Sequence, residues 1–71
     1  MIYVTHDYIT KKFDTDTQAF AYIKAEMDKH NLSYNRVFDK ESNGVRVVVY
    51  QYYTLYMEAF IIHGEFELRR I

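Results

Sequence analysis

The chain contains no cysteine, no proline and only two glycines among its 71 residues. Without cysteine, disulfides and thiolate metal sites are excluded, and the composition is compatible with a reducing compartment. A domain of this length buries only about 60% of the surface that its unfolded chain exposes. Its stability must therefore come from apolar packing alone. We expect one domain over residues 1–71, because no repeat, linker or low-complexity segment is visible.

The chain also lacks an excess of charge of either sign. Nine basic and ten acidic residues give a formal net charge of −1, and no block of like charge exceeds two residues. A general nucleic-acid binder usually has a basic excess, and a DNA mimic would need a strongly acidic surface. The charge pattern therefore predicts a mixed, solvated surface.

No segment resembles a membrane span or a signal peptide. The longest apolar run, residues 45–62, is interrupted by Arg46, Gln51 and Glu58 and is a poor bilayer span. The N-terminus lacks a basic region followed by an apolar core. We therefore expect a cytoplasmic protein with no membrane partner.

Aromatic residues are abundant, with eight tyrosines and five phenylalanines. This is more than so small a core can enclose, so some tyrosines should be partly exposed, and dimerisation is a second way to cover them. Four tyrosines lie within the apolar run, which contains no Gly, Pro, Asn, Asp or Ser. Such a run requires a packed, β-rich core.

The N-terminal half predicts one strand followed by one helix. Residues 2–9 are rich in β-branched and aromatic types, which is typical of a strand. Thr15, with Gln18 three residues later, forms a capping box for a helix from about Asp16 to His30, with Asp14 as the alternative cap. The helix has an apolar stripe of Ala19, Phe20, Ile23 and Met27. Asn31 can adopt the left-handed C-cap, with Leu32 folding back onto the helix.

Asn43-Gly44 is a strong signal for a two-residue hairpin, because a type I′ turn needs positive φ at both central positions. The resulting register places Glu41 opposite Arg46, which joins opposite charges across the strands. The flanking strands are predicted over 34–42 and 45–52. The second is apolar on both faces, which suits an interior strand, and the more polar first strand suits an edge.

The remainder of the apolar run is ambiguous. One strand of eighteen residues would span roughly 60 Å, so we expect a break near Tyr53-Thr54. We then expect a weaker hairpin turn at His63-Gly64, with the last strand carrying alternating residues from Glu65 to Arg69. The alternative is a helix over Leu55–His63, because Leu, Met, Glu and Ala are good helix formers.

Together these elements predict an α+β fold in the order β-α-β-β-β-β, with an antiparallel sheet of four to five strands and one helix packed on one face. The helix would cover the sheet face that carries Val47 and Val49, or the alternate face of the same strand. The opposite face would be open, and the surplus tyrosines would appear there.

No residue pattern points to catalysis, a metal or a cofactor. His6, His30 and His63 lie in three different elements, and none of their spacings places two ligands on one face. Ser33 and Ser42 occupy turn-like positions, and so small a chain can hardly spare the volume of a substrate pocket. We therefore expect a protein that is not an enzyme.

Two kinds of binding fit the residue types. A platform of Arg36, Lys40, Arg46, Tyr50 and Tyr52 resembles sheets that stack single-stranded bases. Protein binding fits better, because Tyr and Arg are enriched in interface hot spots. The predicted partner-binding residues are Tyr34, Arg36, Arg46, Tyr50, Tyr52, Tyr53 and Tyr56. The structural alternative is that about half of these tyrosines are simply buried.

In its size, its lack of cysteine and proline and its aromatic content, the chain is similar to small proteins of bacteriophages and other mobile elements, many of which bind and block a host protein. We therefore expect a small protein-binding module, with inhibition of a host protein such as a defence nuclease as one form. The alternatives are a single-stranded nucleic-acid-binding protein and a self-assembling subunit, including a homodimer.

Overall fold

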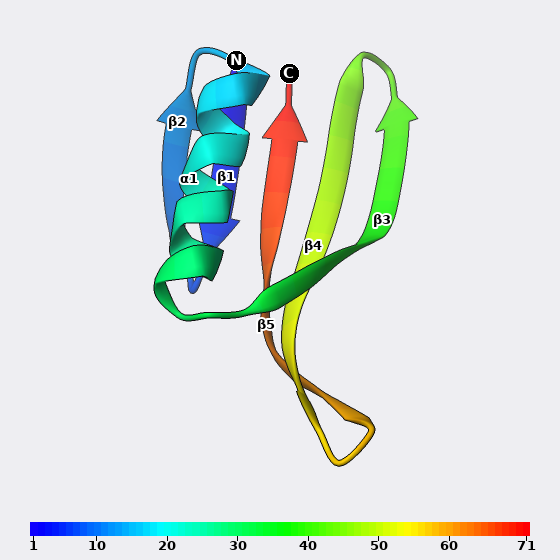
Figure 1. Ribbon diagram of the computed structural model, residues 1–71. Helices are drawn as coiled ribbons and strands as arrows, with labels where there is room; N and C mark the ends of the chain where they lie inside the picture. Colours follow the sequence, from blue (N-terminus) through cyan, green and yellow to red (C-terminus); the bar gives the residue numbers. More distant parts are fainter.

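The computed structural model describes residues 1–71 and shows one helix packed on one face of a five-stranded antiparallel sheet (Figure 1). The predicted α+β fold class is thereby confirmed. Along the chain the elements are β1 (Ile2–His6), β2 (Ile9–Phe13), α1 (Asp16–Lys29), β3 (Ser33–Ser42), β4 (Val45–Tyr56) and β5 (Ala59–Arg70). Across the sheet the strand order is β2-β1-β5-β4-β3.

The ends of α1 follow the local sequence signals. The side chain of Thr15 accepts a hydrogen bond from the backbone N–H of Gln18, and the Gln18 side chain accepts one from the N–H of Asp14. At the other end Asn31 has a φ of 55°, and the N–H of Leu32 donates to the carbonyl of Met27 at 2.9 Å. The predicted N-cap and left-handed C-cap are both confirmed.

The core lies between α1 and the sheet. Its ten buried residues are Ile2, Val4, Ala19, Ile23, Met27, Val48, Tyr50, Tyr52, Phe66 and Leu68. Three of the four predicted stripe residues of the helix are among them. The fourth, Phe20, is 44% exposed and packs its ring edge-on against Tyr50 at the margin of the core.

Residues 2–9 do not form one strand, which corrects the prediction. Asp7 and Tyr8 adopt left-handed conformations, with φ values of 50° and 66°, and make a two-residue turn between β1 and β2. The element order is therefore β-β-α-β-β-β. Neither turn residue is glycine or asparagine, so the sequence carries no ordinary signal for this hairpin.

The hairpin at Asn43-Gly44 has the predicted register, including the pairing of Glu41 with Arg46. It joins β3 to β4, and β3 lies at the edge of the sheet while β4 is an interior strand, as expected. One irregularity between Arg36 and Phe38 leaves Val37 outside the regular pairing. Asn43 and Gly44 have φ values of 53° and 81°, the conformation that this turn requires.

The predicted break near Tyr53-Thr54 is wrong, and so are the turn at His63-Gly64 and the alternative helix. Strand β4 continues to Tyr56, and the turn is formed by Met57 and Glu58, with φ values of 49° and 67°. Only a bulge opposite Tyr52-Tyr53 interrupts the pairing of β4 with β5. The long strands fit because the hairpin projects beyond the rest of the sheet, giving extents of 42 × 24 × 21 Å (Figure 1).

Candidate functional site

Two of the predicted partner-binding residues lie in the core. Tyr50 and Tyr52 are 8% and 9% exposed, because they point to the same side of β4 as Val48, toward the helix. The expectation that they lie on an open face is therefore wrong. Their burial raises the pKa of each phenol, and the charge of Asp7 adds to this effect at Tyr52.

Tyr34, Arg36 and Arg46 lie on the helix side of the sheet. The ring of Tyr34 packs edge-on against Tyr50, and the two arginines lie beside the carboxylate of Asp39. Arg46 makes two hydrogen bonds to that carboxylate, of 2.9 and 2.7 Å, and Arg36 approaches it to 3.4 Å. The Arg46 hydrogen bond is the main reason that the pKa of Asp39 is lowered. Both guanidinium groups are therefore already engaged within the protein.

The predicted base-stacking platform is not assembled on one face. Lys40 pairs with Val47, whereas Arg36 pairs with Tyr50. Since side chains alternate along a strand, Lys40 points away from the helix and Arg36 points toward it. The expected set is thus divided between the two faces of the sheet, and its tyrosines are buried.

The other predicted residues, Tyr53 and Tyr56, belong to a projecting arm, which we define as residues 53–63. Pairing with β3 ends where Ser33 meets Tyr53, and pairing with β1 ends where Thr5 meets Glu67. Beyond these points β4 and β5 pair only with each other. The arm is therefore a two-stranded ribbon with both outer edges unpaired (Figure 1).

The surface of the arm is strongly apolar. Six of its large hydrophobic side chains are between 44% and 84% exposed: Leu55, Tyr56, Met57, Phe60, Ile61 and Ile62. No lysine or arginine occurs between Arg46 and Arg69, and Glu58 in the turn is the only charged residue of the arm. Such an exposed apolar cluster is typical of an interaction site.

One face of the arm continues into the sheet face that α1 leaves uncovered. Tyr53 pairs with Ile62, and Leu55 pairs with Phe60, so these four side chains share a face. The rings of Tyr53 and Phe60 pack edge to face at 5.0 Å. On this face Gln51 lies between Val49 and Tyr53. We call the apolar residues on either side of it the apolar strip, and its members are Phe38, Val47, Val49, Tyr53, Leu55, Phe60 and Ile62.

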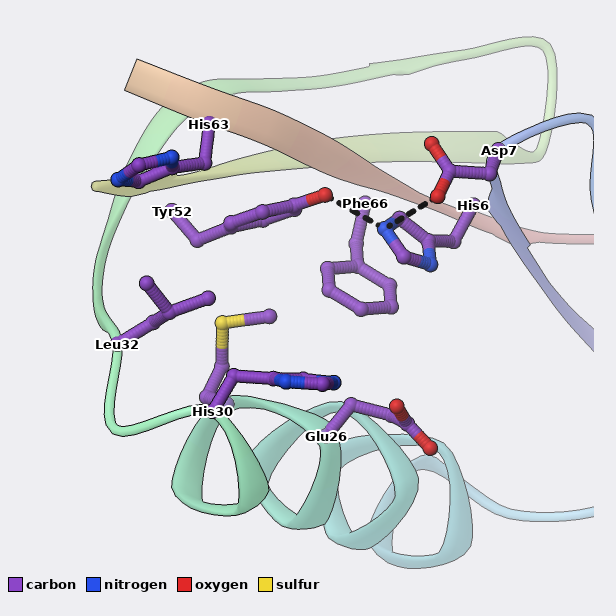
Figure 2. Close-up of a pocket in the computed structure, with 9 residues that line it drawn as sticks. His6, Asp7, Glu26, His30, Leu32, Tyr52, His63 and Phe66 are labelled. Carbon is purple, nitrogen blue, oxygen red and sulfur yellow. Dashed lines mark hydrogen bonds and ion pairs between the residues drawn. The ribbon is translucent and has the colours of Figure 1, made fainter. Parts of the chain in front are cut away.

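At the base of the arm, on the helix side, an open pocket of about 340 Å³ lies between α1 and the sheet (Figure 2). All three histidines of the chain line it, although the sequence places them in different elements. Their positions in the sequence carry no signal for this, because only the pairing of β1 with β5 and the packing of α1 bring them together. No group of three or more His, Asp or Glu is arranged to hold a metal ion.

Two of the three histidines at this pocket have polar side-chain partners. His6 stacks on Phe66, with ring centroids 4.1 Å apart, and its Nε2 lies 2.7 Å from the Tyr52 hydroxyl and 3.5 Å from Asp7 (Figure 2). His63 Nε2 lies 2.7 Å from the hydroxyl of Thr54. The pocket therefore offers polar groups above an apolar floor, with two of its imidazoles already engaged.

α1, the sole helix, has neither the length nor the apolar character needed to cross a lipid bilayer. Comparisons of the chain with known protein families, with curated proteins and with solved structures found no match.

Proposed function

We propose that this protein is a small protein-binding module whose binding surface is the projecting arm together with the apolar strip. The observation that carries the proposal is the exposure of six large apolar side chains on a ribbon that no other element supports. An isolated two-stranded hairpin is at best marginally stable in water. A bound partner would supply the packing that the arm lacks within the chain.

The chemistry of the arm favours a protein partner over a nucleic acid. Nucleic-acid binding relies on lysine and arginine at the phosphate backbone, and the arm contains neither. Exposed Tyr, Phe, Met, Ile and Leu side chains instead match the apolar centre of a protein–protein interface. This shifts the proposed site from the tyrosine cluster of β4 to the end of the β4–β5 hairpin.

As a finer form of this proposal, binding would block a host protein, such as a defence enzyme, in the cytoplasm. The similarity of the chain to small bacteriophage proteins in size and composition is what supports this form. The proposal that the arm binds a protein does not depend on whether that protein belongs to a host.

The chain offers a matched pair of variants for the test. Ile62 on the arm and Ile9 on β2 are both strand isoleucines, 52% and 62% exposed. We would immobilise the wild type, Ile62→Glu and Ile9→Glu, capture proteins from a lysate treated with nuclease, and identify them by mass spectrometry. Circular dichroism would establish that each variant is folded.

The expected result is a nuclease-resistant protein that the wild type and Ile9→Glu retain and Ile62→Glu loses. Both a second copy of the bait and a different protein count as this result. If Ile62→Glu and Ile9→Glu retain the same proteins in equal amounts, the arm is not the binding surface and the proposal fails.

A further inference from the structure

We propose that the partner covering the apolar strip is a second copy of this chain, packed strip against strip about a two-fold axis. This inference rests on the proposed function, because it names the partner of the same surface. The pairing of the strands places the strip on the sheet face opposite the buried residues under α1. The single helix covers one face of the sheet (Figure 1), so two copies can meet face to face without displacing either helix. The assembly would be a small β-sandwich, in which facing sheets lie about 10 Å apart.

The first argument is the extent of the apolar surface. Phe38, Leu55, Phe60 and Ile62 are between 47% and 63% exposed. At about 200 Å² for a large side chain, this corresponds to roughly 450 Å² of apolar surface. A standard interface buries about 800 Å² per partner, of which about 65% is apolar in homodimers, or roughly 520 Å². The partly exposed Val47, Val49 and Tyr53 supply the difference.

The second argument is self-complementarity. The strip itself contains no charged side chain. The charged residues beside it on the same face are Lys40, Arg69, Glu65 and Glu67, and their charges sum to zero, so this face does not select a partner of opposite net charge. A row of aliphatic and aromatic side chains is chemically complementary to an identical row. A two-fold axis also presents every residue twice, so each apolar contact is made two times in the dimer.

The third argument is that the exposed strands of the arm carry no lysine, arginine or proline. Native edge strands are commonly shielded by lysine, proline or inward-pointing charges. The stretch from Ala59 to Gly64 has no charged residue and no proline. A chain with this segment uncovered would be prone to non-specific association, whereas a face-to-face dimer covers its Phe60 and Ile62 side chains in a defined way.

The test is the oligomeric state of the full chain by sedimentation equilibrium, followed by isotope-filtered NOE spectroscopy on a mixture of labelled and unlabelled protein. We expect the wild type to have twice the mass of one chain. We also expect intermolecular NOEs between the Ile62 and Leu55 methyl groups and the ring of Phe60. Ile62→Glu should weaken dimerisation by about 100-fold or more, since the charge is buried twice, and Ile9→Glu by less than about threefold.

A monomeric wild type would overturn the inference. The proposed function would then stand only if the capture experiment identified a different protein that Ile62→Glu loses. A dimer without NOEs from the strip, or a dimer that Ile62→Glu leaves intact while folded, would place the contact elsewhere and also overturn it. If Ile62→Glu fails to fold, the mass and the NOEs of the wild type still show whether the chain dimerises through the apolar strip.

Discussion

The phenol ring of Tyr52 lies directly across Gly64 on the neighbouring strand. A Cβ atom at position 64 would overlap both the hydroxyl and the ring of Tyr52. The φ of Gly64 is not in the left-handed region, in contrast to Gly44 with its φ of 81°. Glycine is therefore needed at position 64 for space, and this space allows the Tyr52 hydroxyl to reach His6 Nε2 at 2.7 Å.

We expect Gly64→Ala to destabilise the protein by about 1–3 kcal/mol, the usual cost of overpacking. In a Tyr52→Leu background, where no ring crosses position 64, the same substitution should cost much less. Urea unfolding of the four proteins in a double-mutant cycle measures the coupling. Equal costs in the two backgrounds would show that the cost of Gly64→Ala does not arise from Tyr52.

The two buried tyrosines should ionise last as the pH rises. The pKa of Tyr50 and Tyr52 is raised by burial in the folded state, whereas unfolded tyrosine has a pKa of about 10. Folding then favours the neutral phenol. This contribution to stability is fully present below about pH 10 and is lost as the pH rises through the folded pKa.

Absorbance at 295 nm during an alkaline titration should show a late phase that coincides with loss of structure. Tyr50→Phe and Tyr52→Phe should each remove part of that phase, because both phenols are buried. If all tyrosines ionise in a single early step while the protein stays folded, Tyr50 and Tyr52 are accessible to solvent.

The features that the sequence predicted correctly are those set by neighbouring residues. The capping box at Thr15, the C-cap at Asn31 and the turn at Asn43-Gly44 each depend on the chemistry of a few adjacent positions. The turns at Asp7-Tyr8 and Met57-Glu58 have the same backbone conformation without the usual residues. Their geometry is imposed by the pairing of the flanking strands.

The candidate site was harder to predict, because it depends on which face of β4 the helix covers. Both faces of this strand are apolar, with Val47 and Val49 on one and Val48 and Tyr50 on the other. Contacts with α1 and β1, which are distant in sequence, determine which face of β4 is buried. Tyr53 and Tyr56 are the only arm residues in the predicted partner-binding set, and of these Tyr56 is exposed and Tyr53 is half-buried. The rest of the arm was not predicted, since Gly64 resembled a turn residue.

Removing the charge of Asp39 should destabilise the fold at neutral pH. The hydrogen bonds from Arg46 lower the pKa of Asp39 below that of an unfolded aspartate, so its contribution to stability is present above about pH 4 and is lost as the pH falls through the folded pKa. Asp39→Asn should therefore be less stable than the wild type at pH 7, and the two should converge as the pH falls below the folded pKa of Asp39.

Urea denaturation of both proteins across this pH range provides the measurement. Asp28→Asn serves as the control, because the pair formed by Asp28 and Lys24 is an exposed helix pair that contributes only about 0.3–0.5 kcal/mol. A difference between wild type and Asp39→Asn that does not change with pH would contradict the role assigned to the charge.

Replacing the turn residues of the arm should stabilise the fold, because Met57 and Glu58 occupy left-handed conformations that Asn and Gly adopt more readily. A non-glycine residue in this region costs about 1–2 kcal/mol, so replacing Met57-Glu58 by Asn-Gly should stabilise the protein by about 1 kcal/mol or more. For a domain of this size that is a rise in Tm of about 4–8 °C per kcal/mol.

The reciprocal change tests the same cause at the other end of β4. Replacing Asn43-Gly44 by Met-Glu should lower the Tm by a similar amount, because the backbone conformations of the two turns match. Both variants should be melted at one fixed protein concentration, since any self-association makes Tm depend on concentration. If the Asn-Gly turn instead lowers the Tm, the Met57 side chain contributes packing that outweighs the relief of backbone strain. A fall that becomes steeper at higher protein concentration would locate that packing in the contact between two copies.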